Sequence, residues 1–280
     1  MGSLLEPDID LKKFEPYMID CGRCCGLCCV ALYFSRMDGF PEDKEAGEPC
    51  KNLHNDYKCR VHSSLSGLGL HGCMAYDCFG AGQKVTGQIP FKPDWNTIED
   101  QEAEKIFQSF LTVMHLHQTL WYLTEASVLR IGESLKEQIR LLKNEGKDLT
   151  EQPLQILLNT EAEPFREKAN SLLKRISTEI ASRFGAEFKP DVFKDYMGRN
   201  LRGKKLQGKD FSMALMIASN LERADLQGAN FLGADMRDAN IRNTDLSQSL
   251  FLTQIQINAA KGNEGTILPP YLKRPSAWVE

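Results

Sequence analysis

The most regular pattern in this chain is a large apolar residue at every fifth position from Leu201 to Phe251. A small residue often stands two positions before it, and Asp or Asn often lies between the two. A period of five matches neither an α-helix nor a flat strand. It predicts a coil with flat sides of five residues, whose large residues fill the axis. The central positions are Leu201, Leu206, Phe211, Met216, Leu221, Leu226, Phe231, Met236, Ile241, Leu246, Phe251 and finally Gln256.

Spacings of three and four residues predict two long helices before the coil. The first covers about 97–130, and the second runs from about Pro164 to Phe184, with Gly185 behind its end. The predicted stripes are Ile106, Phe110, Val113, His117, Leu120 and Thr124 in the first helix, and Phe165, Ala169, Leu172, Ile176 and Ile180 in the second.

A third helix is predicted from its start and stop signals. Ser134 and Glu137 match a capping box that opens a helix through Leu142, and Gly146 is its expected stop. The segment FGAGQKV at 79–85 lacks the spacing of a phosphate-binding loop, so it is predicted to be a turn.

All nine cysteines lie between Cys21 and Cys78, in a glycine-rich segment that predicts an irregular, loop-dominated unit. The first residues do not resemble a secretory signal, so we expect a cytoplasmic protein with reduced thiols. Clustered thiolates then favour zinc or an iron–sulfur cluster over disulfides or redox-active thiols. The candidate ligands are Cys21, Cys24, Cys25, Cys28, Cys29, Cys50, Cys59, Cys73 and Cys78.

Nine thiols can serve two four-coordinate sites with one left over, and the sequence does not identify the spare. Two Cys-x-x-Cys steps interleave, Cys21 with Cys24 and Cys25 with Cys28. His62 is a weaker candidate ligand, since a solvated surface histidine is the more common case.

The segment ASNLERADLQGANFLGADMRDANIRNTDL at 218–246 resembles the A(D/N)LXX pentapeptide repeat. The resemblance implies a right-handed quadrilateral β-helix with four pentapeptides per coil. About twelve units then give about three coils. Lys204 and Lys209 stand where a small residue belongs, which predicts a distorted first coil. Leu268, Pro269 and Trp278 are expected to cover the last one, because an open edge invites further pairing.

The cysteine segment resembles the zinc- or iron-chelating domain of the CxxCxxCC type. An additional residue breaks the family spacing, so either Cys21 or Cys24 provides the first ligand. Together with the repeats, this segment is similar to bacterial pentapeptide-repeat proteins described as oxetanocin A resistance proteins. The matched positions are Cys25, Cys28, Cys29, Cys50, Cys59, Cys73 and Cys78.

These patterns predict a multidomain protein with a loop-rich cysteine module, an α-helical middle and a short β-helix. The expected parts are a metal-binding domain at 1–95, a helical segment at 96–185, the pentapeptide-repeat β-helix at 196–262 and a capping tail at 263–280. With 280 residues, 42% hydrophobic residues and a net charge of −4, the chain has an ordinary globular composition.

Charge bears on the choice of partner. Some pentapeptide-repeat proteins protect DNA gyrase by imitating DNA, which requires a long acidic surface. Residues 201–260 hold seven basic and six acidic residues, a net charge of +1. This balance disfavours a gyrase-type target and gives no reason to expect nucleic acid. We expect a protein partner and no membrane association, because no apolar run approaches the ~20 residues of a membrane span.

No Ser–His–Asp set, nucleotide fingerprint or spaced carboxylate pair stands out, so binding is expected rather than catalysis. The sequence predicts a non-enzymatic metal-binding interaction protein of the pentapeptide-repeat type. Its resemblance implies a role in antibiotic resistance or target protection. The alternative is an iron–sulfur protein with a redox or sensing role.

Overall fold

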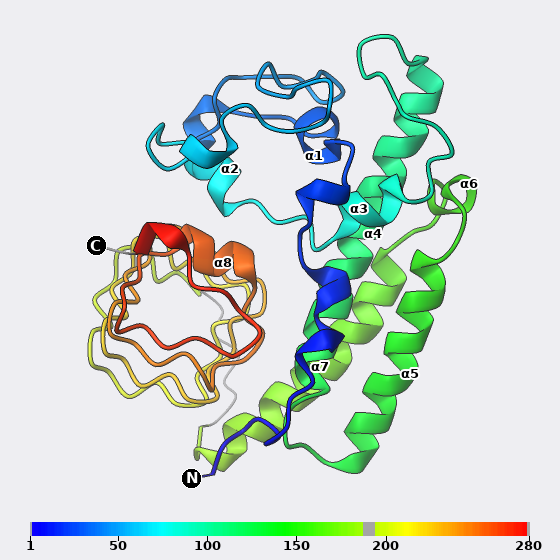
Figure 1. Ribbon diagram of the computed structural model, residues 1–280. Coiled ribbons are helices and arrows are strands. Elements are labelled where there is room, and N and C mark those ends of the chain that lie inside the picture. The colour runs from blue at the N-terminus through cyan, green and yellow to red at the C-terminus, as the bar shows by residue number, and fades with distance from the viewer. Residues whose placement is uncertain (1, 187–193, 279–280) are drawn as a thin grey trace. The chain divides into compact units, whose positions relative to one another are not determined.

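The structure, a computed structural model, describes residues 2–186 and 194–278 (Figure 1). Contacts divide the described chain into two compact units. We call residues 12–121 and 141–169 the cysteine unit, and residues 2–11, 122–140, 170–186 and 194–278 the repeat unit. None of the described helices is both long and apolar enough to cross a bilayer.

Three long helices, α4 (Asp100–Ala126), α5 (Glu133–Thr150) and α7 (Glu163–Arg183), each contribute residues to both units. The two helices predicted from apolar stripes are confirmed as α4 and α7, and every residue of both stripes is buried. Helix α4 ends at Ala126, a few residues before the expected end.

The prediction for α5 was wrong at both ends. The helix begins at Glu133, so Ser134 lies inside it, and it runs past Gly146 to Thr150. In the cysteine unit, a Cβ at Gly146 would lie 2.5 Å from Cζ of Phe165 and 2.8 Å from Cδ2 of Leu120. Glycine here permits close packing of the helices. This packing outweighs a helix-propensity cost of about 1 kcal/mol.

The first part of the cysteine unit is rich in loops, and its helices are short. The segment at 79–85 is helix α3 and not the predicted turn, because Gly80 supplies a left-handed N-cap with a φ of 74°. The short helices of the described chain are η1 (Leu11–Lys13), η2 (Glu15–Tyr17), η3 (Cys21–Arg23), α1 (Leu27–Ala31), η4 (Arg36–Asp38), η5 (His62–Ser64), α2 (His71–Ala75), α3 (Ala81–Thr86) and α6 (Leu154–Leu157), and, in the repeat unit, α8 (Gln254–Ala259) and η6 (Ser276–Trp278).

The repeat unit contains the predicted coil, visible in Figure 1 as stacked turns. Between residues 195 and 250, parallel bridges join residues 20 positions apart, such as Asn220 and Asn240, whose side chains also share a hydrogen bond of 3.1 Å. A coil therefore takes four pentapeptides. Within the described residues these contacts are isolated bridges rather than extended strands. The right-handed sense implied by the resemblance stays a prediction.

The first coil is regular, contrary to expectation. Bridges join Asn200 to Asn220 and Lys205 to Asp225, in the same register as those of later coils. The side chain of Lys204 is exposed to solvent and does not point into the axis, so the coil accommodates it.

Central residues one coil apart form columns along the axis. Phe211, Phe231 and Phe251 are all fully buried, and the rings of the first two stack with centroids 5.4 Å apart. The other central positions from Leu221 to Leu246 are buried as well. This interior of stacked large side chains is the hydrophobic core of the coil.

Helix α8 ends the regular repeats. The Nε2 group of Gln256 donates hydrogen bonds to the carbonyl oxygens of Phe231, at 2.8 Å, and Ala234, at 2.9 Å. Further along, Trp278 is buried, and its Nε1 donates to the carbonyl of Ala260 at 3.1 Å. These side chains satisfy carbonyl groups that a further coil would otherwise occupy.

A buried carboxyl group lies where α4 meets the coil within the repeat unit. The backbone N–H of Phe251 donates to Oε1 of Glu125, which is completely buried. Burial raises the pKa of Glu125 to about 8, against the opposing effects of that N–H and of the Tyr271 hydroxyl. The neutral acid is therefore the form that suits this core.

Replacing this group should make stability less dependent on pH. The raised pKa means that the folded state binds a proton between about pH 4.5 and 8 that the unfolded state has lost. Stability should therefore fall across that range by up to about 1.4 kcal/mol per pH unit. Glu125→Gln should remove this slope and be more stable than the natural chain at pH 8, measured by urea unfolding. Equal slopes in the two proteins would contradict the prediction.

Candidate metal centre

Two short helices set the directions of the first five cysteines. Asp20 caps η3 by accepting a hydrogen bond of 3.0 Å from the N–H of Gly22. Gly26, with a φ of 79°, begins α1, which carries Cys28 and Cys29 in its first turn. In the cysteine unit η3 packs against α3, which brings the start of the cysteine segment to Cys78.

Four thiols form what we call the core quartet, which consists of Cys21, Cys24, Cys28 and Cys78. A Cβ at Gly82 would lie 2.7 Å from Sγ of Cys24 and 3.6 Å from Sγ of Cys78, so both sulfurs lie beside this glycine. Electrostatic interactions join Cys28 to Cys24 and Cys78, and Cys21 to Cys24.

The sulfur of Cys78 is also positioned by backbone groups. Burial raises the pKa of Cys78 to about 12, although the N–H groups of Gly82 and Gly80 favour its thiolate. Such N–H groups are suited to a sulfur that carries negative charge, as a metal-bound thiolate does.

Four other thiols form the loop quartet, which consists of Cys29, Cys50, Cys59 and Cys73. The N–H of Cys50 donates to the carbonyl of Cys29 at 2.9 Å, and a bridge pairs Cys59 with Leu53. Electrostatic interactions join Cys73 to all three other members. These thiols therefore lie in one neighbourhood, although Cys29 comes from α1, Cys73 from α2, and Cys50 and Cys59 from the segment between these helices.

Lys44 is a functional candidate that the sequence analysis missed. Its side chain is buried, and Nζ donates to the carbonyls of Leu32 at 2.6 Å, Glu45 at 3.0 Å and Val30 at 3.1 Å. Burial lowers its pKa, whereas the nearby thiolate charges of Cys50 and Cys29 raise it. A buried cation among thiols favours thiolates, and only the folded structure reveals this position.

Cys25 lies beside Cys24, with which its thiol interacts electrostatically, but its other contacts differ from those of the quartets. Its sulfur lies 3.2 Å from Oγ1 of Thr86, and its carbonyl accepts a hydrogen bond of 2.7 Å from Nε1 of Trp95. The side chain is 2% exposed and belongs to the hydrophobic core of the cysteine unit. Burial raises the pKa of this thiol to about 11. These contacts are those of a packed structural cysteine.

His62 lies next to Cys59, because its backbone N–H donates to the Cys59 carbonyl at 3.3 Å. His62 is exposed, and His117 is buried with Nδ1 at 2.7 Å from the carbonyl oxygen of Phe79. Burial lowers the pKa of His117 to about 4, so this ring is neutral in the core.

The donor set suits a thiophilic metal, but the sulfurs have not converged on a point. None of the nine cysteines forms a disulfide. Across residues 2–186 and 194–278, no three Cys, His, Asp or Glu side chains meet closely enough to hold an ion as they stand. A cysteine sulfur moves between staggered positions by rotation about χ1 alone, so neighbouring thiols can converge with little backbone change.

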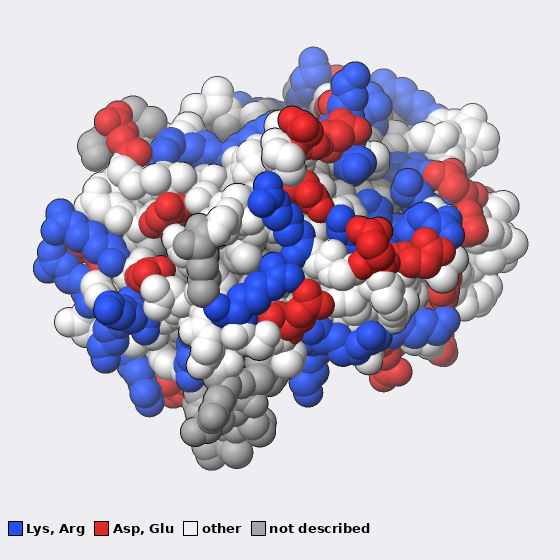
Figure 2. Space-filling model, turned by 90° about the horizontal axis from the view of Figure 1, so that it is seen from below, with Lys and Arg blue, Asp and Glu red and all other residues white. Residues whose placement is uncertain are grey.

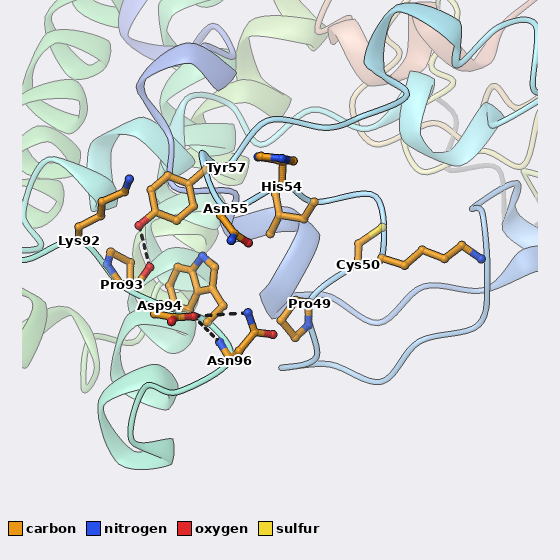
Figure 3. A pocket seen from close by; sticks show the side chains of 12 residues that line it. Pro49, Cys50, His54, Asn55, Tyr57, Lys92, Pro93, Asp94 and Asn96 are labelled. Carbon is orange, nitrogen blue, oxygen red and sulfur yellow. Dashed lines mark hydrogen bonds between the residues drawn. The ribbon is translucent and has the colours of Figure 1, made fainter.

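A cavity of about 370 Å³ lies beside the loop quartet, within the cysteine unit (Figure 3). Its lining includes Cys50, Tyr57 and Trp95. The hydroxyl of Tyr57 donates to the carbonyl of Pro93 at 2.7 Å, and Lys92 lies over the Tyr57 ring. Cys50 is the member of the loop quartet that lines this cavity.

The comparisons with known proteins bear mainly on the repeats. The family model for pentapeptide repeats matches residues 200–231 and 214–251, in eight copies. The chain is similar to YybG of Bacillus subtilis (strain 168), an uncharacterized protein, with 38% identity over 92% of this chain and 94% of YybG. No solved structure matches the chain. The extent of this similarity shows that the chain belongs to the same family as YybG, and the matched repeats show that its C-terminal region consists of pentapeptide repeats.

Proposed function

We propose that this chain is a non-enzymatic metal-binding protein whose N-terminal thiolates hold zinc. The observation that carries this proposal is the gathering of eight free thiols into two neighbourhoods of the loop-rich cysteine unit. Soft thiolate ligands select zinc or iron–sulfur clusters over magnesium or calcium. A metal also provides the stability that a loop-rich segment lacks for want of buried apolar area.

The residues around the thiols support this assignment. Lys44 offsets negative charge at the loop quartet, and the N–H groups of Gly80 and Gly82 do so at Cys78. When bound, zinc would act as a structural cross-link between loops. The chain's own residues would hold the thiolates in place and exclude water from the more buried sulfurs.

Elemental analysis of protein purified without oxygen tests the proposal. Zinc bound in a fixed ratio to the chain is expected. A brown protein that contains iron and acid-labile sulfide would contradict zinc binding and support the alternative, an iron–sulfur protein with a redox or sensing role. A sample without metal, with reduced thiols and an intact cysteine unit, would overturn both.

A glycine substitution tests the site more locally. Gly82→Ala places a Cβ against the sulfurs of Cys24 and Cys78 and should weaken zinc binding by about 10- to 100-fold. Alanine favours a helix more than glycine, so a loss of affinity would not come from a weaker α3. Gly87→Ala is the matched control, because its Cβ would meet no atom closer than 3.5 Å. Competition with a chelator measures both, and equal affinities would contradict the prediction.

For the repeats, we propose binding to a protein partner, which is the common role of pentapeptide-repeat proteins. The coil exposes apolar side chains such as Met213 and Leu215. Figure 2 shows Lys and Arg interspersed with Asp and Glu on the visible face, which does not favour imitation of DNA. A role in antibiotic resistance or target protection predicts increased drug tolerance when the chain is expressed. Unchanged tolerance across drug classes would contradict that role but would not bear on the proposal that the chain binds zinc.

A further inference from the structure

We propose that the chain binds two separate metal ions, one in the core quartet and one in the loop quartet, and that Cys25 is the cysteine that binds neither. This inference rests on the proposed zinc-binding function and adds the number of centres and the ligands of each. It makes both Cys21 and Cys24 metal ligands, whereas the step formed by Cys25 and Cys28 provides only Cys28.

Packing separates Cys24, Cys28 and Cys78, together with Cys25, from the loop quartet. Cys24, Cys28 and Cys78 pack in or against the hydrophobic core of the cysteine unit, next to residues such as Leu27 and Val85. Among the described residues of that core, no member of the loop quartet is found. Backbone hydrogen bonds and bridges between loops position the loop quartet instead, as between Cys29 and Cys50. The quartets are thus held by different parts of the unit.

Electrostatic interactions give the same division. Cys28 and Cys78 interact with Cys24, and Cys50 and Cys73 interact with Cys59. Contacts across the division involve Cys29, which interacts with Cys28 and Cys21. For Cys21, Cys78, Cys50 and Cys73, the thiol with the strongest electrostatic effect belongs to the same quartet, whereas Cys28 and Cys29 act most strongly on each other.

The helix carrying Cys28 and Cys29 explains how adjacent residues serve different centres. Successive side chains on an α-helix point about 100° apart. In α1, Cys28 interacts with Cys24 and Cys78, and Cys29 interacts with Cys50, although the sulfurs of Cys28 and Cys29 are only 4.0 Å apart. The two centres would therefore lie next to each other, and α1 would provide one ligand to each.

Ligand number supports two centres rather than one or three. A structural zinc ion takes four ligands, and each quartet provides four thiolates. The thiol of Cys25 is already engaged by Thr86, and the Trp95 indole fixes its backbone, so neither quartet needs it. One ion would leave four closely spaced thiols without a partner.

Metal counting on matched variants tests the assignment. Under native mass spectrometry the natural chain and Cys25→Ser should each carry two zinc ions. Cys78→Ser and Cys73→Ser should each carry one, and the variant with both substitutions should carry none. One ion in the natural chain, or the loss of an ion from Cys25→Ser, would overturn the assignment but not zinc binding itself. A metal-free natural chain would overturn the proposed function.

A measurement on the natural chain avoids variants that fail to fold. Partial removal of zinc by a chelator, followed by thiol alkylation and peptide mapping, should label the cysteines of one quartet together while the other remains protected. Labels that appear in both quartets within singly loaded molecules would contradict two independent centres. Labelling of Cys25 in step with either quartet would contradict its exclusion.

Discussion

Metal removal under reducing conditions is expected to unfold residues 20–80 while the pentapeptide coils keep their structure. The segment consists mainly of loops and one-turn helices, so little apolar burial would hold it without its ions. Binding free energies of structural zinc are roughly 10–16 kcal/mol and act as folding free energy. The coil has its own buried columns and depends on no cysteine.

Hydrogen exchange followed by peptide mapping measures this effect segment by segment. Chelation should abolish the protection of backbone amides from exchange in residues 20–80 and leave the peptides of 215–250 protected. Added zinc should restore the protection of residues 20–80. The metal-loaded chain with the same chelator already saturated with zinc is the control. Full protection of 20–80 in metal-free, reduced protein would show that packing alone holds the unit.

The second large effect is expected from the phenylalanine column. Phe231→Ala should destabilise the coil by about 3–5 kcal/mol, because it removes a fully buried ring from the middle of the axis. Phe211 lies one coil away on one side and Phe251 on the other, and neither backbone can collapse into the space without breaking its bridges. A cavity should therefore remain.

Urea unfolding followed by the circular dichroism of the coil measures this loss. Phe91→Ala is the matched control, since that ring is 44% exposed and its removal should change stability by less than about 0.5 kcal/mol. A loss below about 1 kcal/mol for Phe231→Ala would mean that the coil relaxes around the missing ring.

The repeats were predictable because their constraint is local and recurs every five residues. Each central residue from Leu201 to Phe251 is identified by its spacing alone, and the structure places most of these side chains in the axis. The helical stripes of α4 and α7 followed from the same kind of pattern. Gly146 was misread because its role is set by Leu120 and Phe165, which are far away in sequence.

The grouping of the thiols into two sets could not be predicted from the sequence for a similar reason. Spacing pairs Cys21 with Cys24 and Cys25 with Cys28, but the folded chain places Cys25 beside Thr86. The loops that carry Cys50 and Cys59 and the short helix that carries Cys73 have no periodicity that would predict their proximity. No sequence pattern marks Lys44 either, because its importance comes from its burial beside cysteines that are distant in sequence.

The 20-residue register limits how such a protein changes in length during evolution. Gaining or losing one pentapeptide would preserve the local turn but rotate every later residue onto a neighbouring side of the coil. The phenylalanines would then leave their shared column, and Gln256 would face different carbonyls. Whole coils are therefore the natural unit of duplication and deletion, and relatives of different length should differ here by multiples of about 20 residues.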